Sequence, residues 1–533
     1  MGSRRYWTTL RSNGVALPPP YVPKGLRIVV AGRQVPLSPL AEEMAYAWAK
    51  KKDTQYVGDP VFVSNFMKDF SKELPEPLRG VGYDQLDFRE FYEEVDREKR
   101  AKENATKEEK KLLAQQRKKQ REELKDRYGY AWADGERMEI ANWLVEPAGI
   151  FMGRGAHPFR GRWKPRVEAG DITLNLDEKT EVPEGSWGEV MHDHGSMWLA
   201  RWTDKLTGKM KYVWPHDSSS LQQEKNREKY DNAMKLETRI HRIRKAIERG
   251  LASRDPKTRK MATVCYLIDK LGMRVGDEKD ADEADTVGAT TLRVEHVHVS
   301  GTTMEFDFLG KDSVRWNKTI ENAEPAVLDN FRRFSAGKGP QDQIFDGITS
   351  RTVNGFLSGV APNITAKVFR TYQATKTVQE FLERHTHDRL PEADENEKLY
   401  YARRANLEAA VVCNHKRTPP KNWEESLNRK KELLKEIEAR EGRTDKEKHR
   451  IAQRTSKLKL QLDLAVRTRD YNLNTSLKNY IDPRTFRSWC AYVDLDWKKL
   501  YTGTLQRKFE WASRSRQPWN SADLGQAPRI RAT

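Results

Sequence analysis

Residues 475–484 read TSLKNYIDPR, and this stretch near the end of the chain guides the interpretation of the rest. Asp482 followed by Pro483 predicts the beginning of a helix, with Asp as the N-cap and Pro at the first helical position. Tyr480 therefore lies just before a helix N-terminus, where backbone N–H groups and the helix dipole favour an anion. Such a tyrosine is either a packed aromatic side chain, which is the commoner case, or a nucleophile that attacks a phosphate.

The size and charge of the chain indicate several domains and a polyanionic partner. Its 533 residues are too many for one hydrophobic core. Lys and Arg number 97 against 79 Asp and Glu, which gives a formal net charge of +18. Each phosphate that such a surface neutralises releases condensed counterions, so nucleic acid is the favoured partner. The 15 Trp, 18 Tyr and 17 Phe argue against wholesale disorder.

The cysteine pattern is typical of a reducing compartment. Cys265, Cys413 and Cys490 form no C-x-x-C pair, which argues against a disulfide framework and a cysteine–zinc site. No apolar run approaches the ~20 residues of a membrane span, and the first 14 residues lack the apolar core of a secretory signal. We therefore expect an intracellular protein without a membrane partner, and a nuclear one if the partner is DNA in a eukaryote.

Two histidine pairs are the only hint of a metal site, and no metal or other cofactor is expected. His192 and His194 alternate around Asp193, as do His296 and His298 around Val297, but no further ligand cluster follows either pair. Such pairs are more often exposed or hydrogen-bonded histidines than ligands.

The first 220 residues read as a mixture of short strands, loops and one strongly charged segment. Residues 25–38 predict a hairpin with its turn near Ala31. Residues 93–127 have high helix propensity and almost no apolar stripe, which predicts a solvated helix rather than a basic helix that follows DNA. Residues 128–220 predict strands and loops.

Residues 230–420 predict helices interrupted by a hairpin. Strands are expected at 295–299 and 304–309, the second with Met304, Phe306 and Phe308 on one face. The turn at 310–313 then places Lys311 at the tip of a hairpin.

Residues 424–469 predict an antiparallel pair of charged helices. Leu427 and Leu434 are seven residues apart, a spacing typical of packed helices. Thr444 and Glu447 form a capping box that begins the second helix. The apolar stripe is interpreted as packing within the pair.

Five residues together suit transesterification at a phosphodiester without a metal. Tyr480 would be the nucleophile, Arg274 and Arg370 would bind the non-bridging oxygens, His415 would donate to the developing charge, and Lys311 would protonate the leaving oxygen. Each residue alone is more often a surface, turn or helix-capping residue. Composition and spacing do not assemble the five; the motifs around them do.

Those motifs resemble the eukaryotic type IB DNA topoisomerases, in order and over most of the chain. They are RVGDEKDADEADTVG (274–288), LRVEHV (292–297), EFDFLGKDS (305–313), TAKVFRTY (365–372), CNHKRTPPK (413–421) and NYIDPR (479–484). The resemblance implies that the five residues named above form a catalytic pentad. It also implies that DNA and the inhibitor camptothecin contact Arg154 and His157, in MGRGAHP, and Asp312 and Asn479.

For the fold, the resemblance implies an α+β multidomain protein that forms a bilobed DNA clamp. One lobe would be a mixed α/β cap, and the other a mostly α-helical catalytic lobe of the tyrosine recombinase and type IB topoisomerase kind. The family usually carries a long charged N-terminal region, whereas this chain begins almost directly at the core, and its linker is shorter than in the animal enzymes. The expected parts are a cap with the charged helix (1–110), a β-rich core part (111–220), a catalytic core (221–420), a helical-hairpin linker (421–470) and a C-terminal domain with the tyrosine (471–533).

For function, the resemblance implies relaxation of supercoiled duplex DNA through a 3′-phosphotyrosyl intermediate, strand rotation and religation, without ATP or metal. A nuclear monomer acting in replication and transcription is expected; in some lineages the core and tyrosine segments are separate associating chains. A tyrosine recombinase, which uses a similar residue set, and a non-catalytic basic DNA-binding protein are the alternatives.

Overall fold

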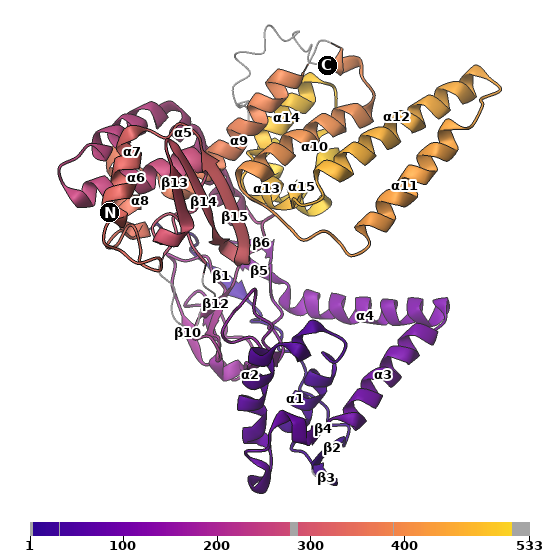
Figure 1. The fold of residues 1–533 in the computed structure, drawn as a ribbon. Helices are drawn as coiled ribbons and strands as arrows, with labels where there is room; N and C mark the ends of the chain where they lie inside the picture. Colours follow the sequence, from indigo (N-terminus) through magenta and orange to yellow (C-terminus); the bar gives the residue numbers. More distant parts are fainter. Residues whose placement is uncertain (1–3, 31, 278–285, 387–388, 514–533) are drawn as a thin grey trace. The chain divides into compact units, whose positions relative to one another are not determined.

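The computed structural model describes residues 4–30, 32–277, 286–386 and 389–513. The described residues form two compact units, 4–222 and 223–513, and each is described by itself. Helices and short sheets occur in both units, which confirms the expected α+β class (Figure 1).

The first unit contains small sheets built from short strands. The hairpin expected at 25–38 is confirmed by β2 (Arg27–Val30) and β3 (Arg33–Pro36), while Ala31 lies outside the described residues. The region 128–220 is rich in strands, as predicted. Its strands, with the others of this unit, are β1 (Leu10–Ser12), β4 (Leu86–Asp87), β5 (Tyr130–Ala133), β6 (Glu136–Glu139), β7 (Gly149–Ile150), β8 (Trp163–Lys164), β9 (Thr173–Asn175), β10 (Glu189–Met191), β11 (Ala200–Thr203) and β12 (Met210–Val213).

Two hydrophobic cores hold this unit together. Helices α1 (Pro39–Ala49) and α2 (Pro60–Phe70) bury a cluster of aromatic rings in which Trp48 stacks on Phe66. A second core lies among the strands of 130–213 and includes Trp7 and Leu174. Sheets in this unit have the strand orders β1-β5-β6, β10-β9-β11-β12, β3-β2-β4 and β7-β8.

The charged segment predicted as one solvated helix is helical, but it forms two helices, α3 (Arg89–Asn104) and α4 (Lys107–Tyr128). Helix α3 is partly packed, with Glu94 buried, so only α4 matches the prediction of a solvated helix. A capping box causes the break: the Thr106 hydroxyl accepts from the Glu109 N–H at 3.2 Å, and the Glu109 carboxylate accepts from the Thr106 N–H at 2.8 Å. Not one side chain of α4, all of whose residues are described, is buried. Helix propensity and end capping therefore stabilise α4 without a buried apolar face.

In its described residues, the second unit is mostly helical around one three-stranded sheet. The sheet has the order β13-β14-β15 and is antiparallel. Its strands are β13 (Val297–Ser300), β14 (Thr303–Gly310) and β15 (Val314–Ile320). The helices are α5 (Ser220–Leu251), α6 (Pro256–Leu271), α7 (Pro325–Ser335), α8 (Ser350–Val360), α9 (Ala366–His385), α10 (Glu395–Val412), α11 (Trp423–Glu438), α12 (Asp445–Arg467), α13 (Leu473–Asn479), α14 (Pro483–Tyr492), α15 (Gly503–Lys508) and α16 (Glu510–Ser513).

The hairpin prediction is confirmed, but its first strand starts later than expected, because Val294–His296 form a 3₁₀ turn before β13. Met304, Phe306 and Phe308 of β14 are buried on one face, as their alternation requires. A short 3₁₀ turn, Lys311–Ser313, joins β14 to β15 and places Lys311 at the end of the hairpin.

Helix α9 belongs to two hydrophobic cores. Its first half, through Phe369 and Tyr372, packs in the core formed by α5–α8 and the sheet. Its second half, through Ala374 and Val378, packs with α10 and the C-terminal helices. Side chains between these halves are thereby held by packing on both sides.

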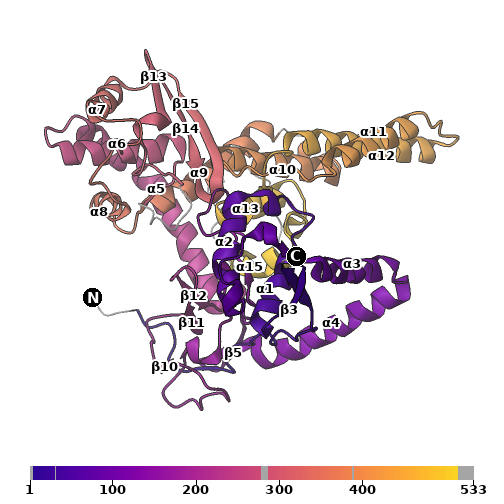
Figure 2. The same ribbon diagram turned by 60° about the horizontal axis from the view of Figure 1, so that its bottom comes forward.

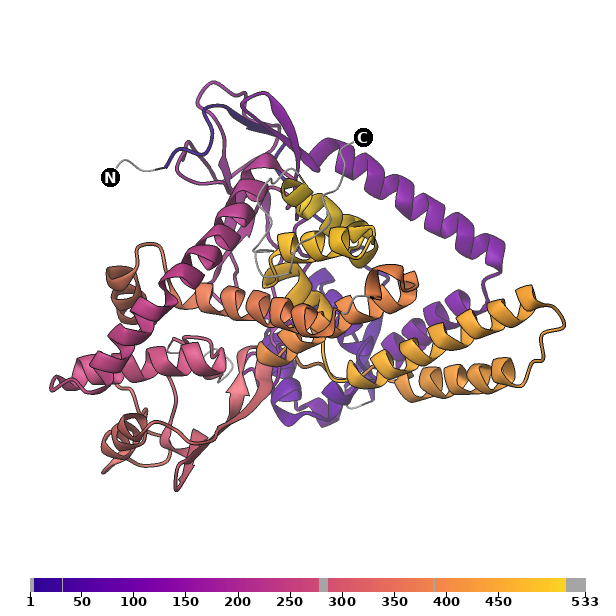
Figure 3. The same cartoon turned by 90° about the horizontal axis from the view of Figure 1, so that it is seen from above.

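Helices α11 and α12 lie side by side as an antiparallel pair, as predicted (Figures 2 and 3). Leu427, Ile437 and Leu458 are buried in this pair. The Thr444 hydroxyl and Glu447 form the predicted capping box at the start of α12. None of the helices in the described ranges has the length and apolar composition that a membrane crossing requires.

Candidate active site

The second unit brings the five predicted catalytic residues together, most of them at the ends of its helices and of its hairpin. Arg274 lies two residues beyond Gly272, the left-handed C-cap of α6 (φ 64°). His415 follows the C-terminus of α10, after Asn414, which also has positive φ. Arg370 lies within α9, and Tyr480 is the C-cap of α13. Helix ends thus supply three of the five side chains, because a helix that stops can aim the next residues at a common point.

The Tyr480 hydroxyl is surrounded by positive charge. Its oxygen accepts a hydrogen bond from Arg274 Nη1 at 3.2 Å. The guanidinium carbon of Arg370 lies 5.1 Å from the centre of the tyrosine ring, and the ring of His415 lies at the same centroid distance. Burial alone would raise the pKa of Tyr480, but the charges of Arg370 and Arg274 outweigh it, so the pKa lies below its ordinary value. The site therefore makes the phenolate, the nucleophilic form, easier to reach than in an ordinary tyrosine.

The backbone of Tyr480 is tied to α9. The Thr375 hydroxyl donates to the Tyr480 carbonyl at 3.2 Å and accepts from the Asp482 N–H at 3.0 Å. Asp482 caps α14 and forms a buried ion pair with Arg484, which confirms the predicted helix start. Arg484 also pairs with Asp231 of α5 at 2.8 Å. One helix, α9, thus positions both Arg370 and the turn that carries the tyrosine.

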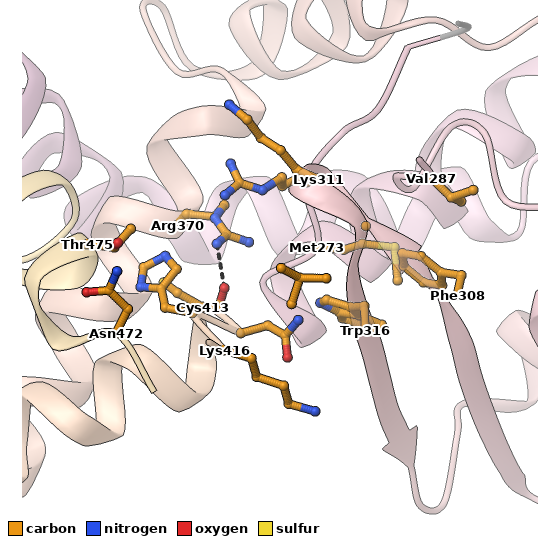
Figure 4. Close-up of a pocket in the computed structure, with 15 residues that line it drawn as sticks. Met273, Val287, Phe308, Lys311, Trp316, Arg370, Cys413, Lys416, Asn472 and Thr475 are labelled. Carbon is orange, nitrogen blue, oxygen red and sulfur yellow. Dashed lines mark hydrogen bonds between the residues drawn. The ribbon is translucent and has the colours of Figure 1, made fainter. Parts of the chain in front are cut away.

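Arg370 is a buried cation, and some of its N–H donors are not used by carbonyls in the described part of the chain. It donates through Nη1 to the Gly272 carbonyl at 2.6 Å and through Nη2 to the Cys413 carbonyl at 2.7 Å (Figure 4). Its Nε has no partner among the described residues. Since a guanidinium carries five N–H donors, three remain for another acceptor.

His415 is buried with both ring nitrogens lacking a hydrogen-bond partner within the described part of the chain. Its backbone is fixed, because its N–H donates to the Ala410 carbonyl at 2.8 Å and its carbonyl accepts from the Asn472 N–H at 2.7 Å. Burial, with Arg370 and Arg274 nearby, lowers the pKa of His415 to about 3. The imidazole is therefore neutral at physiological pH and carries one free N–H donor.

Lys311 lines the same pocket as Arg274, Arg370 and His415. In Figure 4 its side chain projects from the hairpin end, and Phe308 and Trp316 stack on each other on the neighbouring strands. Lys416 lines this pocket too, so the pocket combines two ammoniums, two guanidiniums and a neutral imidazole beside a tyrosine hydroxyl. This donor set suits a phosphate oxyanion and a leaving oxygen that needs a proton.

Family comparisons cover nearly the whole chain. Residues 5–215 match the DNA binding fragment of eukaryotic DNA topoisomerase I, residues 218–448 match its catalytic core, and residues 452–521 match the C-terminal topoisomerase domain. The chain is 33% identical to human DNA topoisomerase 1, over 95% of this chain and 70% of the human protein. It belongs to the eukaryotic DNA topoisomerase I family. The resemblance drawn from the motifs is thereby confirmed.

Other members of the topoisomerase I family are also similar. DNA topoisomerase 1 beta of Arabidopsis thaliana is 37% identical over 96% of this chain and 59% of its own length. DNA topoisomerase 1 of Drosophila melanogaster is 36% identical over 95% of this chain and 54% of its own length. The chain thus spans only about half to two thirds of the length of most of these topoisomerases.

The four expected DNA and inhibitor contacts of a topoisomerase I come from both units. Arg154 and His157 lie in the first unit, between β7 and β8, where His157 Nδ1 accepts from the Phe159 N–H at 3.1 Å. In the second unit Asn479 ends α13, and its carbonyl accepts from Lys229 Nζ at 2.8 Å. The side chain of Asp312 lies outside the described part.

No group of three or more potential metal ligands occurs among the residues that the structure describes. The pairs singled out in the sequence make other contacts: His192 Nδ1 lies 2.8 Å from the Leu176 carbonyl, and His296 Nδ1 accepts from the Arg293 N–H. The three cysteines are buried free thiols.

Two residues that support the site escaped the sequence analysis, Thr375 and Lys318. Thr375 gives no local signal, because its partners Tyr480 and Asp482 are over 100 residues away. Lys318 could have been found: it follows Trp316 by two positions in β15, so the strand alternation places a lysine on the apolar face.

Proposed function

We propose that this chain is a type IB DNA topoisomerase that relaxes supercoiled duplex DNA. One observation carries the proposal: the Tyr480 hydroxyl accepts a hydrogen bond from Arg274 beside Arg370 and a buried His415 with a free donor. The family supports the reaction class.

In the proposed reaction the Tyr480 oxygen attacks the scissile phosphorus. The oxygen–phosphorus bond to Tyr480 forms as the bond to the 5′ oxygen breaks, which leaves a 3′-phosphotyrosyl end. The phenol proton goes to solvent, and the Lys311 ammonium protonates the departing 5′ oxygen. Arg274, Arg370 and His415 donate to the non-bridging oxygens, where charge develops. One phosphoester replaces another, so no ATP is needed, and religation reverses each step.

Strand rotation would occur while the covalent bond persists. Supercoil torque drives the free 5′ end around the intact strand until religation captures it. We propose that the two units act as a mixed α/β cap lobe and a helical catalytic lobe that close around the duplex, with the net charge of +18 supplying phosphate contacts. A closed clamp should stay on closed-circular plasmid at high salt and slide off linear DNA.

The proposal also includes the domain division, the DNA and inhibitor contacts, the oligomeric state and the cellular setting. The division into parts at 1–110, 111–220, 221–420, 421–470 and 471–533 is testable by limited proteolysis. The proposed contacts with DNA and camptothecin are Arg154, His157, Asp312 and Asn479. The proposed active species is a monomer. It would act in replication and transcription in the nucleus.

The deciding experiment is plasmid relaxation in EDTA without ATP, followed by a denaturing trap. We expect relaxation and a 3′-linked protein–DNA adduct. Tyr480→Phe should bind DNA with the same salt dependence but relax nothing, whereas Tyr492→Phe, on α14 away from the pocket, should be fully active. Normal relaxation by Tyr480→Phe would contradict the assignment of Tyr480 as the nucleophile. If the wild type binds DNA but forms no adduct, a non-catalytic DNA-binding protein is favoured. Sequence-specific strand exchange would instead favour a recombinase.

A further inference from the structure

Lys318 occupies a position where a strand normally places an apolar residue. It follows the buried Trp316 by two positions in β15 and pairs in register with Phe306 of β14, which is fully buried. Its amine lies 5.5 Å from the centre of the Trp316 ring. A cation on the core face of a sheet is costly unless it is hydrogen-bonded, so its partners are informative.

Those partners are the ends of two helices. Lys318 Nζ donates to the Leu271 carbonyl at 2.9 Å and to the Val412 carbonyl at 2.8 Å. Leu271 is the last residue of α6, and Val412 is the last residue of α10. The last carbonyls of a helix have no partner within it and form the negative end of its dipole, so they suit a buried ammonium.

Arg370 binds the next carbonyl of each helix end. Its Nη1 donates to Gly272 and its Nη2 donates to Cys413, each one residue beyond a Lys318 acceptor. Two cations from different elements, β15 and α9, therefore hold two consecutive carbonyls at the end of α6 and two at the end of α10. Two residues beyond each held pair the chain reaches Arg274 and His415.

We propose that Lys318 is a positioning residue, which with Arg370 fixes the ends of α6 and α10 and so sets the spacing between Arg274 and His415 around the Tyr480 hydroxyl. Lys318 is not among the residues that line the pocket, so it acts through others. The proposal rests on the proposed function for its effect on rate, but its structural part does not.

The charges around Lys318 support this role. Burial lowers its pKa to about 8; the Cys413 thiol acts in the opposite sense, and Arg370 and Lys416 act in the same sense. No carboxylate contributes to this balance, so the carbonyls of α6 and α10 provide its stabilisation. The amine is mostly charged at neutral pH. Its hydrogen bonds are therefore charge-assisted, and such bonds are about twice as strong as those between neutral groups.

The size of the expected effect follows from the sensitivity of catalysis to geometry. A misplacement of ~1 Å can lower a rate by about 10²-fold, and loss of a group that orients catalytic residues typically costs about 10- to 100-fold. Lys318→Met keeps the apolar stem and removes both donors. We expect it to slow single-turnover cleavage of a suicide DNA substrate and religation by the same factor, about 10- to 100-fold.

Lys398→Met is the matched control. Lys398 is a buried lysine of α10 whose amine donates to the Asp494 carbonyl at 3.3 Å, away from the pocket. We expect Lys398→Met to cleave at the wild-type rate, and both variants to bind DNA as the wild type does. Lys318→Arg keeps a cation that can donate to both carbonyls and should recover most of the rate.

Hydrogen exchange gives a readout that needs no activity. In Lys318→Met, amides of 272–277 and 413–416 should exchange faster than in the wild type and in Lys398→Met. Unchanged exchange there, or wild-type cleavage by Lys318→Met, would overturn the proposal, as would a Lys318→Arg protein that restores protection without restoring rate. If Lys318→Met does not fold, Lys318→Arg carries the same comparison of exchange and rate. Failure of the proposed function is distinct, because the wild type itself would then form no adduct.

Discussion

Helices α4 and α9 are both charged and of similar length, yet they use their charges in opposite ways. None of the side chains of α4 is buried, and all its lysines and arginines except the half-buried Lys125 are exposed. Helix α9 packs in two cores and buries Arg370 against the carbonyls of Gly272 and Cys413. A solvated charge contributes little to local stability and is screened by salt, whereas a buried one is fixed in direction and is costly to leave unpaired. Burial, not charge, separates a solvated helix from a catalytic one.

The largest expected contrast comes from removing one arginine from each helix. Arg370→Ala removes oxyanion donors and leaves two buried carbonyls without their partner, so single-turnover cleavage should fall by ~10²–10³ or more. Arg117→Ala, on the exposed surface of α4, should cleave at the wild-type rate with at most a small change in the salt dependence of binding. Equal losses in the two variants would remove the distinction drawn between the helices.

The pH dependence of stability sharpens the comparison at His415. Its pKa is about 3 in the folded chain against about 6.5 when unfolded. Between these values the unfolded chain binds a proton that the folded chain does not, so acid destabilises the fold, by about 1.4 kcal/mol per pH unit from this group. His415→Gln removes this term. Its free energy of unfolding relative to wild type should therefore rise as the pH falls from 6.5 to 5.

Denaturant titrations across that pH range measure the effect, with His449→Gln on the exposed surface of α12 as the control for loss of a histidine. A constant difference between His415→Gln and wild type at all pH values would contradict a buried neutral imidazole.

A smaller effect is expected from the hydroxyl that ties the tyrosine turn to α9. Thr375→Val keeps the shape but leaves the Tyr480 carbonyl and the Asp482 N–H without their partner, which should cost about 1–3 kcal/mol of stability. The cleavage rate should also fall, because the nucleophile loses a backbone anchor. Thr371→Val, at another buried threonine of α9, is the comparison; thermal unfolding and single-turnover cleavage are measured for both. A cleavage rate unchanged in Thr375→Val would mean that packing alone holds Tyr480.

Local signals predicted the elements well where the chemistry is itself local. The helix start at Asp482-Pro483, the capping box of Thr444 and Glu447, and the hairpin end at Lys311 are all confirmed, because each depends on residues within four positions. The break between α3 and α4 was equally local, at Thr106 and Glu109, and was missed.

Local physical rules did not predict which residues form the site. Motifs identified the five residues through family resemblance, and their separations in the chain, from Arg274 to Tyr480, carry no geometric information. The structure added what holds them: Thr375 and Lys318, whose partners are 47 to 107 residues away. Of the two, only Lys318 left a trace in the sequence, as a lysine on an apolar strand face.

The sequence by itself determined which residue types were available, where helices begin and turns form, and that a positively charged chain suits a polyanion. Only the tertiary structure decided which charges are buried and what they bind. Two cores meeting on α9 bury Arg370 with carbonyls as partners, while α4 leaves its own arginines in water. Propensity and capping act over a few residues, but desolvation depends on everything packed around a group, which no local stretch specifies.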